Sequence, residues 1–245
     1  MEQNNDFLNQ TVIVTGAGKG IGRAVALMLA SRGASIIAVS RTQEDLISLE
    51  KEIGARIIAA DLGNLQETQW AAQQAVPADY LVNCAGTTAL DKFIDLSADT
   101  FDHIMAVNTR SALIMSQAYA RDRISQGKAG AIVNVSSISS KIGFAEHTAY
   151  CASKGALDAM TKVMGNELGS HDIRVNTVNP IVTLTPMAVK AWSDPKKAAP
   201  ILNRIPINRF IEPNEVAEAI CFLLGNRASG INGTSLFIDG GFLTR

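Results

Sequence analysis

The sequence predicts an α/β fold built as a single domain, a doubly wound parallel sheet of seven strands. Three observations predict it. Short β-branched, apolar runs alternate with helical patterns along all 245 residues, a glycine-rich turn joins the first run to the first helix, and no linker or internal repeat divides the chain. Strands joined by helices run parallel with right-handed crossovers, so their carboxyl ends share one crevice, where ligands bind.

The predicted strands and helices follow one another in regular alternation. Strands are expected at 11–14, 35–39, 56–60, 80–82, 131–135, 173–178 and 235–238. Helices are expected from the glycine turn to about residue 32, and at 42–53, 65–75, 98–126, from Tyr150 onward and at 214–224. The segment 181–206 contains Pro186, Pro195 and Pro200, which interrupt regular structure, so it is predicted to be a mobile lid rather than a core element.

Composition and charge exclude several classes of function. The net charge is -1 and no run of Lys or Arg is long enough to follow a phosphate backbone, so nucleic acid is not an expected partner. Cys84, Cys151 and Cys221 are far apart and lack metal-ligand spacing, which favours reduced thiols and no metal site. The first residues are acidic and polar, and no apolar run approaches the roughly 20 residues that span a bilayer. We therefore expect a cytoplasmic protein with a small-molecule partner and no membrane association.

A glycine turn follows the first predicted strand. It reads Thr15-Gly16-Ala17-Gly18-Lys19-Gly20-Ile21-Gly22 and opens the first helix. Glycines let the backbone approach a pyrophosphate, and the helix N-terminus offers unpaired N–H groups and positive potential to it. The spacing differs from G-x-G-x-x-G, but the same physics predicts a Rossmann-type dinucleotide site.

The end of the second strand indicates which dinucleotide is bound. In dinucleotide folds this position faces the adenosine ribose, where an acidic residue accepts from a 2′-hydroxyl and an Arg receives a 2′-phosphate. Here Ser40 stands at the acidic position, with Arg41 beside it and Lys19 in the glycine turn. Two cations and a hydroxyl predict NADP(H) rather than NAD(H).

Polar and small residues also occur at the other predicted strand ends. They are Asp61, Asn83, Ser137 and Pro180, and Asn83 is followed by Cys84-Ala85-Gly86. Each has an ordinary explanation as a turn residue, but their shared position predicts one crevice. Asn108 lies inside the long helical pattern, where asparagine is unfavourable, so it either interrupts the helix or points to water.

Tyr150 and Lys154 are four residues apart in one predicted helix, which places both side chains on the same face. An ammonium beside a phenol stabilises the phenolate and lowers the Tyr pKa from about 10, which makes it a usable proton donor. A Tyr and a Lys at this spacing also occur by chance on exposed helices. The convergence of this pair with the strand ends favours a catalytic role.

Over essentially its whole length the sequence resembles the short-chain dehydrogenase/reductase family. The residues that carry the resemblance are Thr15-Gly16-x3-Gly20-x-Gly22, Asp61, Asn83-x-Ala85-Gly86, Asn108, Ser137, Tyr150-x3-Lys154 and Asn179-Pro180 with Thr185. Within the family it is most similar to the dicarbonyl/L-xylulose reductases, also described as tetrameric carbonyl reductases, through residues 15–23, 38–43, 147–154, 192–195 and 202–206. Ile138 departs from a glutamine of that group, and Ile181 from a glycine of many family members.

The resemblance implies NADPH-dependent reduction of a carbonyl such as an α-dicarbonyl or a ketose. By it, Tyr150 donates a proton to the carbonyl oxygen, Ser137 orients that oxygen, Lys154 serves both Tyr150 and the nicotinamide ribose, and Asn108 holds a relay water. The implied cofactor residues are Gly16, Gly18, Lys19, Gly20, Ile21, Gly22, Ser40, Arg41, Asp61, Leu62, Asn83, Ala85, Gly86, Tyr150, Lys154, Pro180, Thr183 and Thr185. The implied substrate residues are Ser137, His147, Tyr150 and Trp192.

The resemblance also implies a homotetramer. Small residues on the Tyr150 helix, at Ala152, Gly155, Ala156 and Ala159, predict close packing against another helix. Two other functions stay open. A 3-oxoacyl-carrier-protein reductase would share every catalytic residue, and a catalytically idle NADP-binding sensor would need only the cofactor site.

Overall fold

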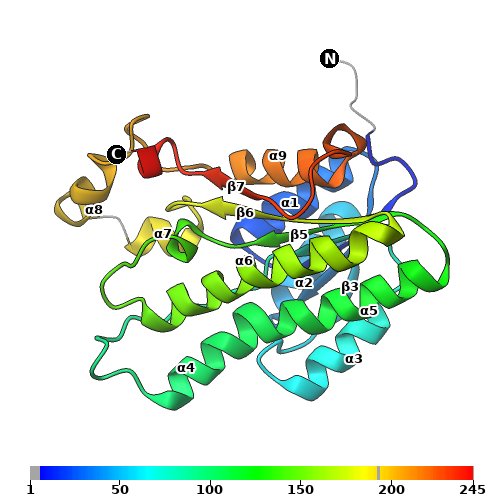
Figure 1. The fold of residues 1–245 in the computed structure, drawn as a ribbon, viewed down its shortest axis with the longest axis horizontal. Coiled ribbons are helices and arrows are strands. Elements are labelled where there is room, and N and C mark those ends of the chain that lie inside the picture. The colour runs from blue at the N-terminus through cyan, green and yellow to red at the C-terminus, as the bar shows by residue number, and fades with distance from the viewer. Residues whose placement is uncertain (1–5, 192–193, 245) are drawn as a thin grey trace.

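The computed structural model describes residues 6–191 and 194–244. Its strands form one parallel sheet in the order β3-β2-β1-β4-β5-β6-β7, and Figure 1 shows this sheet between helices. Their bounds are β1 Thr11–Thr15, β2 Ser35–Ser40, β3 Arg56–Ala59, β4 Tyr80–Asn83, β5 Gly130–Val135, β6 Ile173–Pro180 and β7 Ser235–Ile238. The predicted fold class, a doubly wound seven-stranded parallel sheet, is confirmed.

Two helical layers cover the sheet (Figure 1). One layer contains α1 (Gly20–Ser31), α2 (Gln43–Ile53) and α9 (Pro213–Leu224), and the other contains α3 (Leu65–Ala75), α4 (Ala98–Met105), α5 (Ser111–Ser125) and α6 (Thr148–Leu168). Alternate residues of one strand enter different cores: Val12 and Val14 pack in one apolar cluster and Ile13 in the other. Because both faces are buried, the strands have continuous apolar sequences.

The central strands end in register at one edge of the sheet. Thr15 of β1 pairs with Asn83 of β4, and Asn83 pairs in turn with Asn134 of β5. Short 3-10 turns complete the chain at Ile138–Ser140, Gly169–His171, Asn226–Ala228 and Phe242–Thr244. The predicted polar strand ends therefore lie along one edge, where the site is built.

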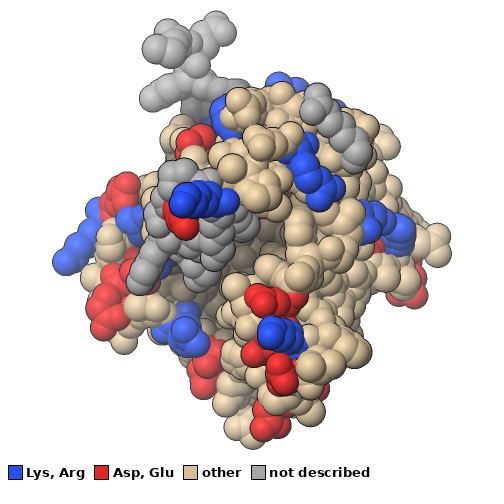
Figure 2. Space-filling model, turned by 90° about the vertical axis from the view of Figure 1, so that its left-hand side faces the viewer, with Lys and Arg blue, Asp and Glu red and all other residues tan. Residues whose placement is uncertain are grey.

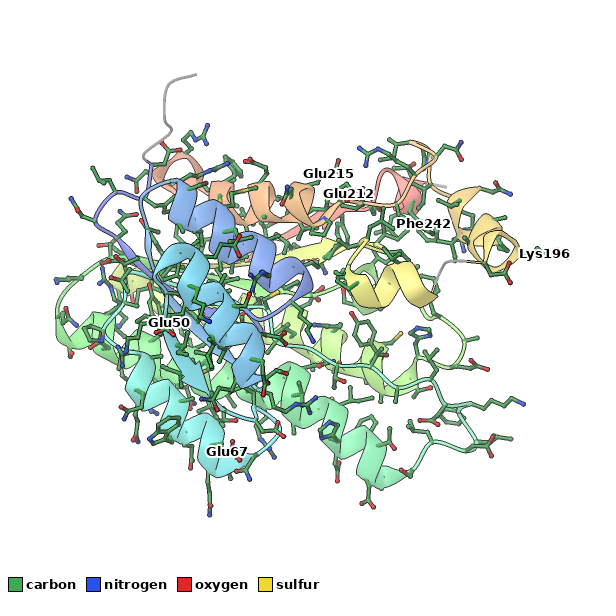
Figure 3. All side chains as sticks on the ribbon, turned by 180° about the vertical axis from the view of Figure 1, so that it is seen from behind. Glu50, Glu67, Lys196, Glu212, Glu215 and Phe242 are labelled. Atoms are coloured by element: carbon green, nitrogen blue, oxygen red, sulfur yellow. The ribbon has the colours of Figure 1, made fainter. Side chains whose placement is uncertain are left out.

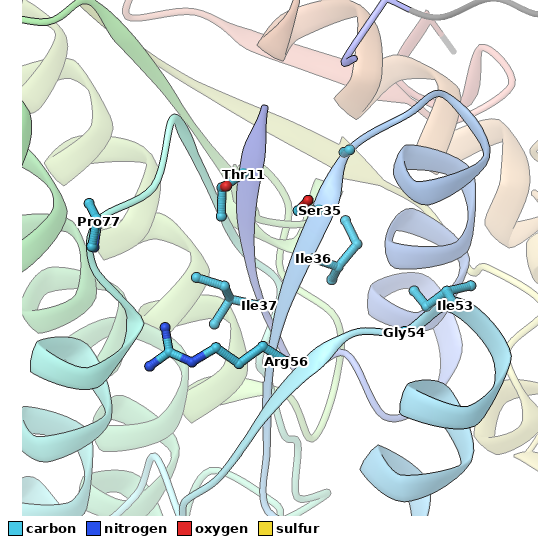
Figure 4. Close-up of a pocket in the computed structure, with 9 residues that line it drawn as sticks. Thr11, Ser35, Ile36, Ile37, Ile53, Gly54, Arg56 and Pro77 are labelled. Carbon is cyan, nitrogen blue, oxygen red and sulfur yellow. The ribbon is translucent and has the colours of Figure 1, made fainter. Parts of the chain in front are cut away.

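A hollow of about 420 Å³ lies at the opposite edge of the sheet (Figure 4). It is lined at the amino ends of β1, β2 and β3 by residues that include Thr11, Ser35 and Arg56, together with Pro77. None of the residues expected to bind the cofactor or the substrate lines it. This hollow is therefore separate from the crevice at the carboxyl ends.

The long helical pattern predicted over 98–126 is confirmed, but one turn inside it is not α-helical. The structure has α4, then a π-helical turn at Ala106–Arg110, then α5. Asn108 lies within the π-helical turn and is 1% exposed. Asn108 therefore interrupts the regular α-helical hydrogen bonding, and its side chain does not point to water.

The segment 181–206 contains more regular structure than predicted. It forms α7 (Pro186–Ala191) and α8 (Pro195–Leu202), and Asp194 caps α8 by accepting a hydrogen bond from the Lys196 backbone N–H. Ile181, Ala198 and Ile205 are buried in the apolar core. Pro195 begins the helix, where the missing N–H is tolerated, so this proline starts α8 instead of breaking it. Figure 3 shows Lys196 on α8 at the periphery of the molecule.

Neither a membrane-spanning helix nor a metal-binding cluster occurs in the described residues. No helix within residues 6–191 and 194–244 has the length and apolar character that crossing a membrane requires. The same ranges hold no cluster of three or more His, Cys, Asp or Glu side chains that could bind a metal ion.

Candidate active site

The glycine turn between β1 and α1 leaves no room for side chains. Gly16 has φ +67°, and a Cβ added there would lie 2.9 Å from the Ala85 backbone. Gly20 has φ +56°, and a Cβ on Gly22 would collide with the Gly16 carbonyl. No side chain caps the start of α1, and its first turn has no acidic residue. The helix N-terminus therefore keeps unpaired N–H groups and positive potential for an anion.

Thr15 connects the glycine turn to the end of β4. Its hydroxyl accepts hydrogen bonds from the backbone N–H groups of Cys84 and Ala85 at 3.0 and 3.1 Å. These contacts bring Ala85 and Gly86 beside Gly16. The sequence placed Thr15 in the glycine motif but did not indicate this role, because its two hydrogen-bond partners lie 69 and 70 residues away.

The residues predicted to bind a 2′-phosphate lie around Gly18. A Cβ on Gly18 would lie 3.0 Å from both the Ser40 hydroxyl and the Asp45 Cβ. Lys19 forms an ion pair with Asp45 at 3.1 Å, and its side chain is 69% exposed. Arg41 is exposed next to Ser40. The structure thus adds a carboxylate, Asp45, that sequence reasoning missed.

Two other predicted cofactor residues differ in where their side chains lie. Asp61, at the end of β3, accepts a hydrogen bond from the Gly63 N–H at 2.8 Å and remains half-buried. The Asn83 amide is buried and donates to Ser116 at 3.0 Å and to Asn134 at 2.8 Å. Its side chain therefore serves a network that links β4 with α5 and β5, and the expected contact of Asn83 with the cofactor stays a prediction.

Asn108 holds the chain segment after β4. Its carboxamide oxygen accepts from the Thr87 N–H at 2.8 Å, while its nitrogen donates to the Thr87 carbonyl at 3.0 Å and to the Ser153 hydroxyl at 2.9 Å. Ser153 donates in turn to the Tyr150 carbonyl at 2.8 Å. Asn108 thus connects the π-helical turn with the Tyr150 helix and with the strand end that carries Gly86.

Tyr150 and Lys154 share one face of α6, as predicted from their spacing. The Lys154 nitrogen lies 5.6 Å from the centre of the Tyr150 ring and donates to the Val135 carbonyl at 2.8 Å. Ser137, just after β5, acts on the Tyr150 hydroxyl and favours its ionised form, which lowers the Tyr150 pKa. A Cβ on Gly86 would lie 3.5 Å from the Lys154 nitrogen, so the ammonium also faces the glycine-lined strand end.

The electrostatics of this cluster differ from the expectation. Burial raises the Tyr150 pKa above its ordinary value, and the hydrogen bond from Ser137 opposes this shift. Burial also lowers the Lys154 pKa to about 8. The expected lowering of the Tyr150 pKa by Lys154 is not found in this structure, because desolvation of the phenolate outweighs the opposing effect of Ser137.

His147 lies just before Tyr150, at the start of α6. Its Nδ1 is 2.7 Å from the Ala145 carbonyl, so Nδ1 carries a proton and donates it. The ring lies 6.3 Å from the Tyr150 ring and 5.9 Å from Phe144. Phe144 in turn lies 6.4 Å from Phe242 of the C-terminal turn, a residue that Figure 3 labels.

The remaining predicted residues lie on or after β6. Pro180 ends the strand, Thr183 is buried, and the Thr185 methyl group would lie 2.9 Å from a Cβ on Gly20. The chain after β6 therefore returns to the glycine turn. Ile138 is only 1% exposed and packs in the apolar core. Trp192, predicted to contact the substrate, lies outside the described residues.

Comparison with known proteins decides the family. Residues 16–243 match a family model described as enoyl-(acyl carrier protein) reductase. L-xylulose reductase of Bos taurus is 47% identical over 94% of this chain and 95% of its own length. The chain belongs to the short-chain dehydrogenase/reductase family. D-erythrulose reductase of Gallus gallus is 46% identical, with 99% of each chain covered.

A solved member of the family has the same fold. The crystal structure of a putative NAD(P)-dependent gluconate 5-dehydrogenase from Beutenbergia cavernae, with bound NADP at low occupancy, matches with a TM-score of 0.94 and 30% identity. The match covers 99% of this chain and 100% of that one. The short-chain dehydrogenase/reductase architecture therefore covers 99% of this chain.

The site fits a dinucleotide on its own geometry. The cradle formed by Gly16, Gly20 and Gly22 excludes side chains, and the uncapped start of α1 faces it. The side of the molecule that Figure 2 presents is hollowed near its centre, and most of its coloured charges lie around the rim. An anion bound at the cradle would thus meet backbone N–H groups without an acidic residue in the first turn of α1.

Proposed function

We propose that the protein is an NADPH-dependent carbonyl reductase that reduces an α-dicarbonyl or a ketose such as L-xylulose. The observation that carries the proposal is the contact of Ser137 with Tyr150, beside Lys154, at the edge of the sheet where the glycine cradle lies. Two relatives at 46–47% identity are named for the ketoses that they reduce, L-xylulose and D-erythrulose. Both names support reduction of a small polar carbonyl.

The proposed mechanism assigns one task to each residue. Ser137 orients the carbonyl oxygen by hydrogen bonding, and Tyr150 donates a proton to that oxygen. Lys154 stabilises the developing phenolate with its charge and holds the nicotinamide ribose. Asn108 supports the proton relay by fixing the segment at Thr87. The cofactor, when bound, supplies the hydride.

NADP(H) is the proposed dinucleotide. Lys19, Ser40 and Arg41 are the donors for a 2′-phosphate, and the related crystal structure was solved with NADP. A phosphate that loses water without gaining donors is strongly unfavourable, so these three side chains would decide the preference. The glycine cradle would hold the pyrophosphate of either dinucleotide.

The experiment that tests the function is a substrate panel. NADPH oxidation is measured with α-dicarbonyls, L-xylulose, other ketoses and acetoacetyl thioesters, using the wild type and Tyr150→Phe. Turnover of dicarbonyls or ketoses that disappears in the variant supports the proposal. Binding of NADPH without turnover of any carbonyl would favour the idle sensor.

A 3-oxoacyl-carrier-protein reductase is the second candidate. One observation favours it: the matching family model is described by an acyl-carrier-protein substrate. The two activities use the same catalytic residues, so only the panel separates them. Activity on acetoacetyl thioesters without activity on small diketones would select this candidate.

We also propose a homotetramer in the cytoplasm. Helices α5 and α6 expose Leu113 and Val163, and Ala152 and Ala159 on α6 are exposed too. Because Ala152 and Ala159 are exposed, a second copy would provide the close helix packing that the sequence predicts. Sedimentation of a stable monomer at micromolar concentration would contradict the tetramer.

The free state of Cys84, Cys151 and Cys221 supports a reducing compartment.

The segment 181–206 is proposed to be the substrate lid. Buried Ile181 and Ile205 anchor its two ends, and α7 and α8 lie between them. Hydrogen exchange measured with and without NADPH tests this proposal. Protection of α7 and α8 on cofactor binding is expected, and equal exchange in both states would contradict a lid.

A further inference from the structure

Asp158 is a buried acid that the proposed mechanism does not use. It lies one helical turn beyond Lys154 on α6, and each residue is 4% exposed. Residues four apart in a helix share a face, so the carboxylate and the ammonium belong to the same buried side of α6. Burial of a charge is costly unless another group compensates it. A buried Asp158 carboxylate is therefore expected to have a hydrogen-bond donor or a cation near it.

Hydrogen bonding compensates Asp158 only partly. Both of its carboxylate oxygens accept from one nitrogen, the Asn179 side-chain amide, at 3.2 and 3.0 Å. The same nitrogen also donates to the Ser137 carbonyl at 3.1 Å and to the Ser140 hydroxyl at 3.0 Å. An amide nitrogen has two hydrogens, so four acceptors share two protons. Within the described part of the chain, Asn179 is the one side chain that donates to Asp158.

Lys154 has the complementary problem. Its nitrogen donates to the neutral Val135 carbonyl. Burial lowers the Lys154 pKa to about 8, and Cys84 and Asp158 oppose this shift. Cys84 carries no charge near neutrality, because burial raises its pKa to about 12. The other titratable group at Lys154, Tyr150, has a raised pKa and is neutral as well.

We propose that Asp158 is the counter-charge that keeps Lys154 as an ammonium ion, which makes it a positioning residue of the catalytic centre. Among the described residues the two groups form no direct ion pair, so Asp158 acts on Lys154 across a gap, through an interior in which little water screens the charge. This inference rests on the proposed function, since the ammonium charge is what stabilises the Tyr150 phenolate. Through Asn179, the same carboxylate also contacts the segment that carries Ser137.

The first test measures the charge of Lys154 directly. The pH dependence of its 13Cε NMR signal, assigned with Lys154→Arg, gives its pKa in the cofactor-free protein. We expect Asp158→Asn to lower this pKa by about one unit or more, the effect typical of losing a nearby opposite charge. Asp158→Glu retains the charge and should restore the wild-type value. Glu167→Gln removes an exposed carboxylate from the same helix and should leave it unchanged.

The second test measures the pH profile of reduction. In Asp158→Asn, the fall of kcat/KM at alkaline pH should begin at a lower pH, displaced by as much as the Lys154 pKa. A merely structural defect would reduce kcat/KM at every pH without displacing the pH at which the fall begins. An unchanged Lys154 pKa in Asp158→Asn overturns the proposal.

If this variant does not fold, the 13Cγ signal of Asp158 in the wild type decides: an ionised carboxylate at neutral pH supports the proposal and a protonated one overturns it. The NMR measurements need no substrate, so failure of the substrate panel would leave their outcome intact.

Discussion

The Lys154 ammonium lies 5.6 Å from the centre of the Tyr150 ring and donates its hydrogen bond to the Val135 carbonyl, 2.8 Å away. The acceptor belongs to β5, 19 residues earlier in the chain. Lys154 is thus held by the end of a strand as well as by its own helix. This arrangement places a proton donor and a cation together, and the first predictions follow from it.

Tyr150→Phe should abolish most of the turnover while NADPH binding stays nearly intact. The substitution removes one hydroxyl, and loss of a general acid typically costs ~10²–10⁴ in rate. The measurements are kcat with the best substrate of the panel and the NADPH Kd from fluorescence. Tyr119→Phe is a matched control, because the Tyr119 hydroxyl bonds Asp79 and Ala131 instead of the site. Retention of most activity in Tyr150→Phe would refute the assigned acid.

Carbonyl reduction should decline above about pH 8 because the Lys154 pKa is lowered to about 8. The side chain is an ammonium below this pH and a neutral amine above it, so stabilisation of the phenolate is lost as the pH rises. The measurement is kcat/KM at saturating NADPH over the pH range from neutral to alkaline. A profile that stays flat through pH 8 would show that the Lys154 charge is not needed.

Ser40→Asp should shift the preference from NADPH toward NADH. A carboxylate there repels a 2′-phosphate and removes one charge-assisted hydrogen bond, which contributes roughly 1.5–3 kcal/mol. The measurement is the ratio of kcat/KM for NADPH and NADH. Ser40→Asn, which adds a side chain of similar size without charge, is the control. A wild type that already prefers NADH would refute the cofactor assignment.

Asp45→Asn should have the opposite effect and strengthen NADPH binding. Its carboxylate pairs with Lys19 at 3.1 Å and lies beside Gly18, next to the expected phosphate site. Removing the acid frees Lys19 for the phosphate and removes a like charge. The NADPH Kd should fall while the NADH Kd changes little. Equal changes of Kd for NADPH and NADH would mean that the Asp45 carboxylate does not interact with the 2′-phosphate.

Thr15→Val should lower both the free energy of unfolding and the affinity for NADPH. The hydroxyl is the acceptor for two backbone N–H groups, of Cys84 and Ala85, and leaving buried groups unpaired costs about 1–3 kcal/mol. Urea denaturation and NADPH titration measure the two effects. Thr15→Ser keeps the hydroxyl and should stay close to the wild type. Equal stability of the Val and Ser variants would contradict this role.

Local patterns in the sequence were sufficient for several features of this protein. The apolar runs predicted all seven strands, because strands buried on both faces cannot alternate with polar residues. The glycine turn was predicted from its residues, since the positive φ at Gly16 and Gly20 favours glycine. The shared face of Tyr150 and Lys154 followed from helix geometry alone. Each depends on neighbours within a few residues.

Tertiary structure alone decided the rest, because the partners are distant in sequence and meet only through packing. The Asn83 amide bonds Ser116 and Asn134 inside the fold, 33 and 51 residues away. Asp158 is joined to Asn179, 21 residues on, only because α6 packs against β6. The Tyr150 pKa likewise depends on burial. Spacing in the sequence determines which side chains share a face, whereas packing determines how much water they lose.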